Sequence, residues 1–173
     1  GKGDRAFCAG GDLKERNGMT DSEWFAQHLV YERMVRAVVA CPLPLIGAIN
    51  GAAYGGGCEL AAALDFIYVS ETARFAQTET KLGIIPGAGG TQNLARSVGE
   101  KRAMELILSG TVFSAEDALE WGLANAICKP DELMDATLAA ARTIAANAPI
   151  AVRQAKQAIH KGLQMGLLDG MAF

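Results

Sequence analysis

Two glycine-led turns and two glutamates are the residues of this chain that could act together on a carbonyl group. The turns are AGGD at residues 9–12 and GGGCE at residues 55–59, and the acids are Glu59 and Glu79. Glycine lets the backbone turn sharply and lets another molecule approach its N–H, so a glycine run that enters a helix can aim unpaired amides at an anion. One such donor typically stabilises an oxyanion by about 2.7 to 4 kcal/mol. The pattern predicts an oxyanion hole flanked by carboxylates.

The two acids differ in how strongly the sequence points to chemistry. Glu59 is expected about one turn inside a helix that continues with LAAA at residues 60–63, so it lies on an apolar helix that is expected to be buried. A tight strand-to-helix turn with close packing would be enough to explain the glycine triplet by itself. It would not explain why a carboxylate is buried in the helix that follows. Glu79 has a plain alternative, which is pairing with Lys81 or Arg74 on a solvated surface. If the acids meet, one can accept a proton and the other can give one, as adding water to a polarised double bond requires.

The elements that must position these residues are strands and helices in the first half of the chain and helices in the second half, which predicts an α/β fold. Apolar runs predict strands near residues 5–8, 45–49, 66–69 and 73–76. Helices are predicted at residues 21–40, 57–64, 91–98, 100–108, 115–121, 131–147 and 150–163, with Ser114 as the cap of the fifth. A further helical pattern runs over residues 167–173. Both ends are expected to be truncated, because the first strand has nothing before it to pair with and the last helix stops before a cap.

Composition narrows the class of protein. A chain of 173 residues of which half are hydrophobic favours one domain over residues 1–173. The net charge of −3 argues against nucleic acid as a partner, and no apolar run approaches the roughly 20 residues of a membrane span. The four cysteines lack zinc-site spacing and are expected to be reduced thiols, so no metal is predicted. They are Cys8, Cys41, Cys58 and Cys128.

Three motifs together resemble the enoyl-CoA hydratase/isomerase (crotonase) superfamily. They are FCAGGDLKE (residues 7–15), NGAAYGGGCEL (residues 50–60) and ETKLGIIPGAGGTQ (residues 79–92), in the order of that family. The start of the third motif is similar to the methylglutaconyl-CoA hydratase branch. The resemblance implies a crotonase-like spiral of β-β-α units followed by a helical C-terminal region, with the first strands and the last helices missing here.

The resemblance also implies a function, which is the reversible hydration of a 2-enoyl-CoA thioester to a 3-hydroxyacyl-CoA. The N–H groups of Gly11 and Gly56 would form the oxyanion hole, Glu59 would chiefly activate water, and Glu79 would chiefly protonate C2. The strip that lines coenzyme A would be Ala9, Gly10, Gly11, Asp12 and Leu13. No metal or redox cofactor is implied, since the coenzyme A thioester is the substrate. The expected oligomeric state is a homotrimer or hexamer. The expected localisation is a bacterial cytoplasm or a mitochondrial matrix.

Several alternatives remain open at this point. One alternative is a double-bond isomerase or an acyl-CoA hydrolase of the same superfamily. Another is a hydrolase that uses Cys58 as its nucleophile. Such a hydrolase needs a base, but His28 and His160 fall in predicted helices where an exposed or packed role is expected. Nucleotide binding is disfavoured because neither GGGCEL (residues 55–60) nor GAGGTQ (residues 87–92) completes a phosphate-binding pattern. An RNA-binding relative would need more basic residues than Lys14, Arg16, Lys101 and Arg102 supply. Tyr54 either shapes an acyl pocket or packs in the core.

Overall fold

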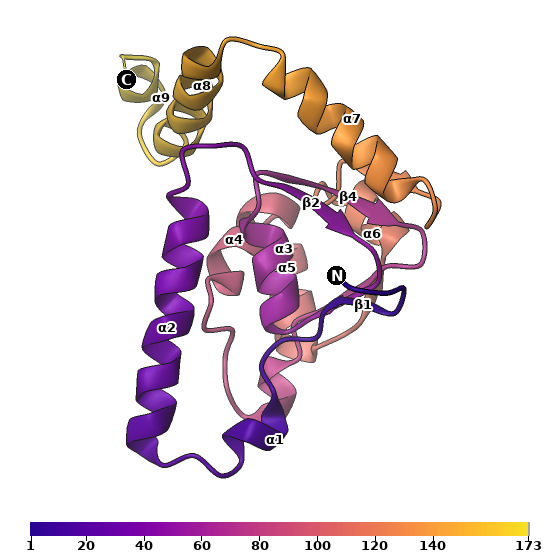
Figure 1. Cartoon of the computed structure of the whole chain (residues 1–173). Helices are drawn as coiled ribbons and strands as arrows, with labels where there is room; N and C mark the ends of the chain where they lie inside the picture. Colours follow the sequence, from indigo (N-terminus) through magenta and orange to yellow (C-terminus); the bar gives the residue numbers. More distant parts are fainter. Residues whose placement is uncertain (173) are drawn as a thin grey trace.

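Seven short strands among residues 1–172, the part of the chain that the computed structural model describes, form two sheets (Figure 1). The first sheet has the order β1 (Ala6–Cys8), β3 (Ala52–Tyr54), β5 (Arg74–Ala76) and β6 (Phe113–Ser114). The second sheet has the order β2 (Ile46–Ile49), β4 (Phe66–Ser70) and β7 (Ala126–Cys128). The strand pairs are parallel apart from β5 and β6, which run antiparallel.

The chain visits both sheets in each repeat and then forms a helix. β2 and β3 are followed by α3 (Gly56–Ala63), while β4 and β5 are followed by the 3-10 helix η1 (Glu79–Leu82) and by α4 (Gly90–Val98). Each repeat therefore adds one strand to each sheet, so that β2 pairs with β4 and β3 pairs with β5. This is the spiral of β-β-α units that the resemblance implies, within the α/β class that the sequence predicts. Because β1, β3 and β5 are parallel neighbours, the loops that leave their carboxyl ends meet at one edge.

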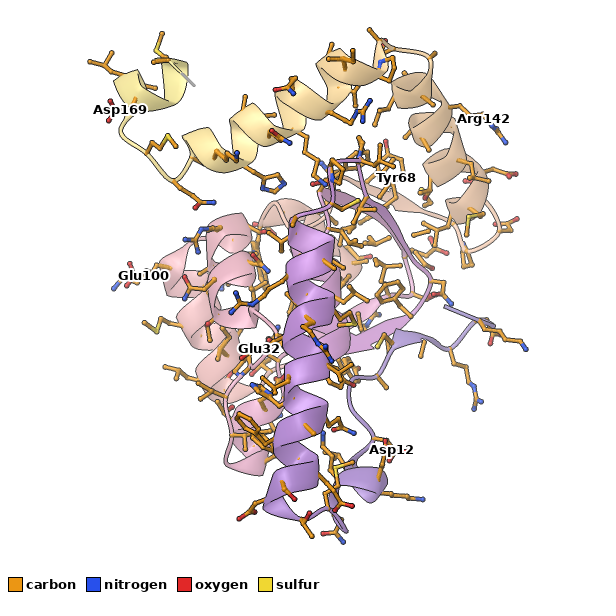
Figure 2. The ribbon with its side chains drawn as sticks, turned by 60° about the vertical axis from the view of Figure 1, so that its left-hand side comes forward. Asp12, Glu32, Tyr68, Glu100, Arg142 and Asp169 are labelled. Carbon is orange, nitrogen blue, oxygen red and sulfur yellow. The ribbon has the colours of Figure 1, made fainter. Side chains whose placement is uncertain are left out.

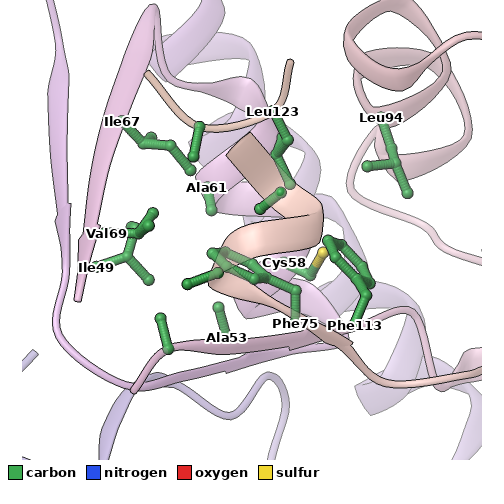
Figure 3. Packing of buried hydrophobic residues seen from close by; sticks show 14 of the residues in the cluster. Ile49, Ala53, Cys58, Ala61, Ile67, Val69, Phe75, Leu94, Phe113 and Leu123 are labelled. Atoms are coloured by element: carbon green, nitrogen blue, oxygen red, sulfur yellow. The ribbon is translucent and has the colours of Figure 1, made fainter. Parts of the chain in front are cut away.

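A core of apolar side chains joins the two sheets to α3 (Figure 3). Ile49 and Val69 of the second sheet are fully buried, and Phe75 of the first sheet stacks on Phe113 with ring centroids 5.3 Å apart. A Cβ atom on Gly47 of β2 would lie 2.7 Å from the Ile67 side chain, so close packing at this point requires glycine. The core fixes the position of α3 relative to both sheets.

Local capping signals set the boundaries of the helices. Thr20 and Glu23 form a capping box at the start of α2 (Asp21–Val39), and Ser114 forms one with Asp117 at the start of α6 (Ala115–Glu120). The other helices are α1 (Leu13–Arg16), α5 (Glu100–Ser109), α7 (Leu133–Ala145), α8 (Pro149–Gly162) and α9 (Leu167–Ala172). The helices predicted from the sequence are confirmed, with ends that shift by a few residues. Phe173 lies outside the described residues. None of the helices in residues 1–172 is long and apolar enough to cross a lipid bilayer.

The structure adds strands that sequence patterns did not reveal. β3 lies between β2 and the glycine triplet, so the turn into α3 follows a strand of the other sheet rather than β2 directly. β3, β6 and β7 have two or three residues each and were not predicted. The first strand, expected to lack a partner before it, pairs in parallel with the later β3. The sheet thus uses a partner that is distant in sequence.

A polar cluster around Asp65 attaches α8 to the rest of the molecule. The carboxylate of Asp65 accepts hydrogen bonds from the Leu45 N–H (2.6 Å) and from Lys156 Nζ (2.6 Å), and its other oxygen lies 3.0 Å from His160 Nε2. Burial opposes ionisation of Asp65, but the bonds from His160, Lys156 and Leu45 outweigh it and lower the pKa of this carboxyl. His160 is exposed and has a structural partner in Asp65, in agreement with the exposed or packed role expected for it.

Candidate functional site

The two glycine turns lie against each other at the carboxyl ends of β1 and β3. A Cβ atom on Gly10 would lie 3.1 Å from the Gly56 nitrogen, and one on Gly56 would lie 3.7 Å from the Gly10 Cα. Gly10 and Gly55 have φ angles of +90° and +53°, which side chains disfavour. A Cβ atom on Gly57 would collide with the Cys8 carbonyl oxygen. Close packing thus explains Gly57, while Gly10 and Gly55 shape the turns.

The amides of Gly11 and Gly56, one from each turn, have no acceptor among the described residues. Among the hydrogen bonds of residues 1–172, none is donated by the N–H of Gly11 or of Gly56. The neighbouring amide of Gly55 is occupied, since it donates to the Ala76 carbonyl over 2.9 Å. Gly56 is the first residue of α3, where the helix leaves its N–H groups unpaired and its dipole favours negative charge. Both free donors therefore lie where an anion could bind.

A cleft of about 470 Å³ opens in front of these amides. This volume lies within the range of small-molecule sites. The lining residues come from the glycine turns, α1, α2, α3, η1 and the loop after η1. They include Ala9, Gly10, Gly11, Leu13, Gly56, Glu59 and Glu79, which sequence reasoning had selected. Asp12 is not among them, because its carboxylate caps α1 by accepting from the Lys14 and Glu15 amides; Figure 2 labels it beside that helix.

Glu59 is held in the cleft wall by the glycine-rich loop before α4. Its side chain is only 3% exposed, and its Oε1 atom accepts hydrogen bonds of 2.8 Å from the amides of Ala88 and Gly90. Burial raises the pKa of Glu59, although these two bonds act in the opposite direction. A Cβ atom on Gly90 would lie 2.8 Å from the Glu59 Cγ, so a glycine is needed for this close approach. The orientation of Glu59 is therefore fixed from the loop side.

Glu79 is buried in η1, and the described residues do not include a salt-bridge partner for it. Its Oε1 atom would lie 3.3 Å from a Cβ on Gly55, while its Oε2 atom is buried with no hydrogen-bond partner. Burial raises the pKa of Glu79, and the nearby charge of Glu59 raises it further. The surface pairing with Lys81 or Arg74, left open by the sequence, is not what the structure shows. Two carboxyl groups, of which Glu59 raises the pKa of Glu79, thus share the cleft with two free amides.

The buried carboxyl of Glu79, whose Oε2 atom has no hydrogen-bond partner, leads to a prediction about stability. Glu79→Gln is expected to raise the free energy of unfolding at neutral pH. The folded-state pKa of Glu79 lies above its ordinary value of 4.5, so the wild type loses stability as the pH rises from there through the folded pKa, whereas the amide does not titrate. The gain approaches about 1.4 kcal/mol for each unit by which the folded pKa exceeds the ordinary one. Urea unfolding of both proteins at acid and neutral pH measures it, and a difference independent of pH would contradict the assignment.

Sequence reasoning selected Leu13 of α1 but missed the part of the cleft wall that Arg16 and α2 provide. Trp24 and His28 stack with ring centroids 5.1 Å apart, and His28 Nε2 lies 3.5 Å from Glu32 Oε1. Tyr31 follows on the same face of α2 and lies under the guanidinium of Arg16. Their spacing along the helix was a signal that could have found them, since residues three and four apart share a helix face. His28, expected to be exposed or packed, lines the cleft; Tyr54 is not among the lining residues.

Cys58 faces the core and not the cleft. It is fully buried (Figure 3), and burial together with the charges of Glu79 and Glu59 raises the pKa of its thiol to about 12. A thiol that stays protonated at neutral pH is a poor nucleophile. This geometry disfavours the cysteine hydrolase alternative. The cysteines of the described residues are free thiols, and no group of side chains in residues 1–172 could hold a metal ion.

Comparison with known proteins agrees with the fold and the motifs. A family model for enoyl-CoA hydratase/isomerase matches residues 1–173. The putative enoyl-CoA hydratase/isomerase YngF of Bacillus subtilis is 46% identical over 172 residues, which cover 99% of this chain and 66% of that protein. The mitochondrial enoyl-CoA hydratase of Pongo abelii is 41% identical, over 97% of this chain and 57% of its own length.

The fold is shared with solved structures as well. The crystal structure of enoyl-CoA hydratase from Bacillus anthracis superposes with a TM-score of 0.96 at 46% identity, over 98% of this chain and 66% of that one. The chain therefore spans about two thirds of the length of this relative. Identity at this level over nearly every residue of the chain, together with the same fold, establishes descent from a common ancestor. The chain belongs to the enoyl-CoA hydratase/isomerase family and has its crotonase fold.

Proposed function

We propose that the protein catalyses the reversible hydration of a 2-enoyl-CoA thioester to a 3-hydroxyacyl-CoA. The observation that carries the proposal is that two buried glutamates and two unpaired backbone amides line the same cleft. Relatives named enoyl-CoA hydratase, such as the Pongo abelii protein and the short-chain-enoyl-CoA hydratase of Clostridium acetobutylicum, support the same class of reaction.

The free amides of Gly11 and Gly56 would receive the thioester oxygen. As water adds to C3, electrons of the double bond move onto this oxygen and an enolate forms. Preorganised N–H donors in a site shielded from water stabilise that charge without reorganising. The strip of Ala9, Gly10, Gly11 and Leu13 lies beside the donors and would contact coenzyme A, while the Asp12 carboxylate remains the cap of α1.

The surroundings of the two acids support a division of labour between them. Glu59 accepts two backbone hydrogen bonds, which favour its ionised form, so it would position water and take its proton. Glu79 has one oxygen without any partner, which favours its protonated form, so it would give a proton to C2. The hydroxyl of water ends on C3 and a hydrogen ends on C2, which balances the addition. This chemistry needs only the coenzyme A thioester as substrate and no further cofactor.

A kinetic assay with three readouts tests the proposal. Purified protein is incubated with crotonyl-CoA, and loss of the absorbance of the conjugated thioester is the expected result. Release of free coenzyme A thiol instead would indicate a hydrolase. Conversion of a 3-enoyl-CoA to the conjugated 2-enoyl-CoA, with no loss of conjugation from crotonyl-CoA, would indicate an isomerase. Either outcome would replace hydration as the assigned activity.

Self-association into trimers or hexamers stays a prediction, with support from exposed apolar side chains near the C-terminal end of the described chain. Ile159 in α8 is 62% exposed, and Leu163, the residue that caps the end of α8, is 83% exposed. Leu167 and Leu168 of α9 are each 79% exposed. The two helices contact each other, and large exposed apolar patches are typical of surfaces that bind another protein chain.

A further inference from the structure

The loop before α4, which orients Glu59, also packs against α2. A Cβ atom on Gly87 of this loop would lie 3.2 Å from the Cε1 atom of His28. A Cβ atom on Gly89 would lie 3.8 Å from the Cγ1 atom of Val35. The two α2 residues are seven positions apart, so they lie on one face of the helix. The two glycines flank the first of the amides that bind the Glu59 carboxylate. One face of α2 therefore supports the loop on both sides of that amide.

The His28 ring is held in place by residues of its own helix. It stacks on Trp24 with ring centroids 5.1 Å apart and an angle of 6° between the ring planes. Its Nε2 atom lies 3.5 Å from Oε1 of Glu32, which Figure 2 labels on α2. The φ angle of Gly87 lies outside the left-handed region, so the nearby ring, and not the backbone conformation, accounts for a glycine there. The imidazole is thus a fixed surface against which the loop packs.

We propose that His28 is a positioning residue for Glu59, because its ring holds the loop where the amides of Ala88 and Gly90 can bind the carboxylate. This inference rests on the proposed function, since it takes Glu59 as the group that accepts the proton of water. Both amides donate over 2.8 Å, so a small retreat of the loop would weaken both hydrogen bonds. Hydrogen bonds to a carboxylate stabilise its ionised form. Without the ring, Glu59 is therefore expected to ionise at higher pH.

NMR titration of isotope-labelled glutamate side chains measures the pKa of Glu59 without turnover, and Glu59→Gln identifies its signal. His28→Ala is expected to raise this pKa by about one pH unit, the effect of losing one hydrogen bond to a charged group. The rising limb of kcat for crotonyl-CoA should move to higher pH by the same amount. KM should change less, because the amides of Gly11 and Gly56 stay in place.

Two further variants separate packing from charge. His28→Phe keeps an aromatic ring and removes the titratable nitrogens, so it should keep the pKa of Glu59 near the wild-type value. If it behaves like His28→Ala, the charge of the imidazole is responsible and the positioning role is overturned. Gly87→Ala tests the same contact from the loop, since its Cβ atom would crowd the ring. It should raise the pKa of Glu59 by itself but add little to His28→Ala, in which the ring is gone.

Phe25→Ala is the matched control, because it also removes an aromatic ring from α2. Phe25 is 59% exposed and does not line the cleft, so the pKa of Glu59 should stay unchanged. Glu79 of η1 and Cys58 of α3, the titratable neighbours of Glu59, are kept in all of these variants.

The remaining outcomes distinguish the positioning role from the proposed function. A raised KM in His28→Ala with an unmoved limb and an unchanged pKa of Glu59 would mean that His28 contacts the acyl group, and would overturn the proposal. A raised pKa of Glu59 in a protein that does not hydrate crotonyl-CoA would refute the proposed function and leave the positioning role standing.

Discussion

Glu59→Gln and Glu79→Gln are each expected to lower kcat for hydration of an enoyl-CoA by about 100- to 10,000-fold, the usual contribution of a general acid or base. Glutamine keeps an oxygen that can accept from Ala88 and Gly90 in place of Glu59. The loss would therefore reflect proton transfer and not a displaced loop. Because both acids serve one addition, the double variant should lose less than the product of the single losses.

Steady-state rates with crotonyl-CoA, together with their pH dependence, measure this effect. The proposed roles need Glu59 ionised and Glu79 protonated, and burial raises the pKa of both. The rate should rise with pH as Glu59 loses its proton and fall as Glu79 loses its own, and Glu79→Gln should remove the falling limb. Glu100→Gln, at the exposed start of α5 (Figure 2), serves as the control and should keep the wild-type rate. Wild-type rates in both acid variants would refute the assigned roles.

Gly56→Pro is expected to lower kcat by about 100- to 1,000-fold, because proline removes the amide hydrogen that would bind the oxyanion. Proline is well tolerated at the first position of a helix, and Gly56 occupies that position in α3. A Cβ atom there has Gly10 Cα as its nearest neighbour at 3.7 Å, which is an ordinary contact. The substitution therefore removes a donor at a site where the fold accepts proline.

Gly56→Ala is the matched control, since alanine adds the same Cβ atom and keeps the N–H. It should retain most of the wild-type turnover, so that the difference between the two variants isolates the donor. Thermal unfolding of both variants checks that α3 still forms. A proline variant that is folded and as fast as the alanine variant would remove Gly56 from the oxyanion hole and leave the enolate without its second donor.

The sequence by itself determined the helices, the glycine turns and the family. Helix ends were readable because capping is local: Thr20 with Glu23 and Ser114 with Asp117 act within one turn. The burial of Glu59 also followed from its own helix, which continues with small apolar residues. The short strands β3, β6 and β7 were not predicted, and each of them pairs with a strand that is distant in the chain.

Only the tertiary structure decided which residues meet. Glu79 is ambiguous in sequence, and its burial arises because η1 follows β5, whose neighbour β3 leads into the glycine turn of α3. The proximity of Gly10 to Gly56 likewise depends on β1 pairing with β3 across more than forty residues. The wall with His28, Tyr31 and Arg16 forms because α1 and α2 pack beside that turn. Residue types and short-range spacing indicate which reactions are possible. The arrangement of the reacting groups in space comes from long-range strand pairing and packing, which leave no local signal in the chain.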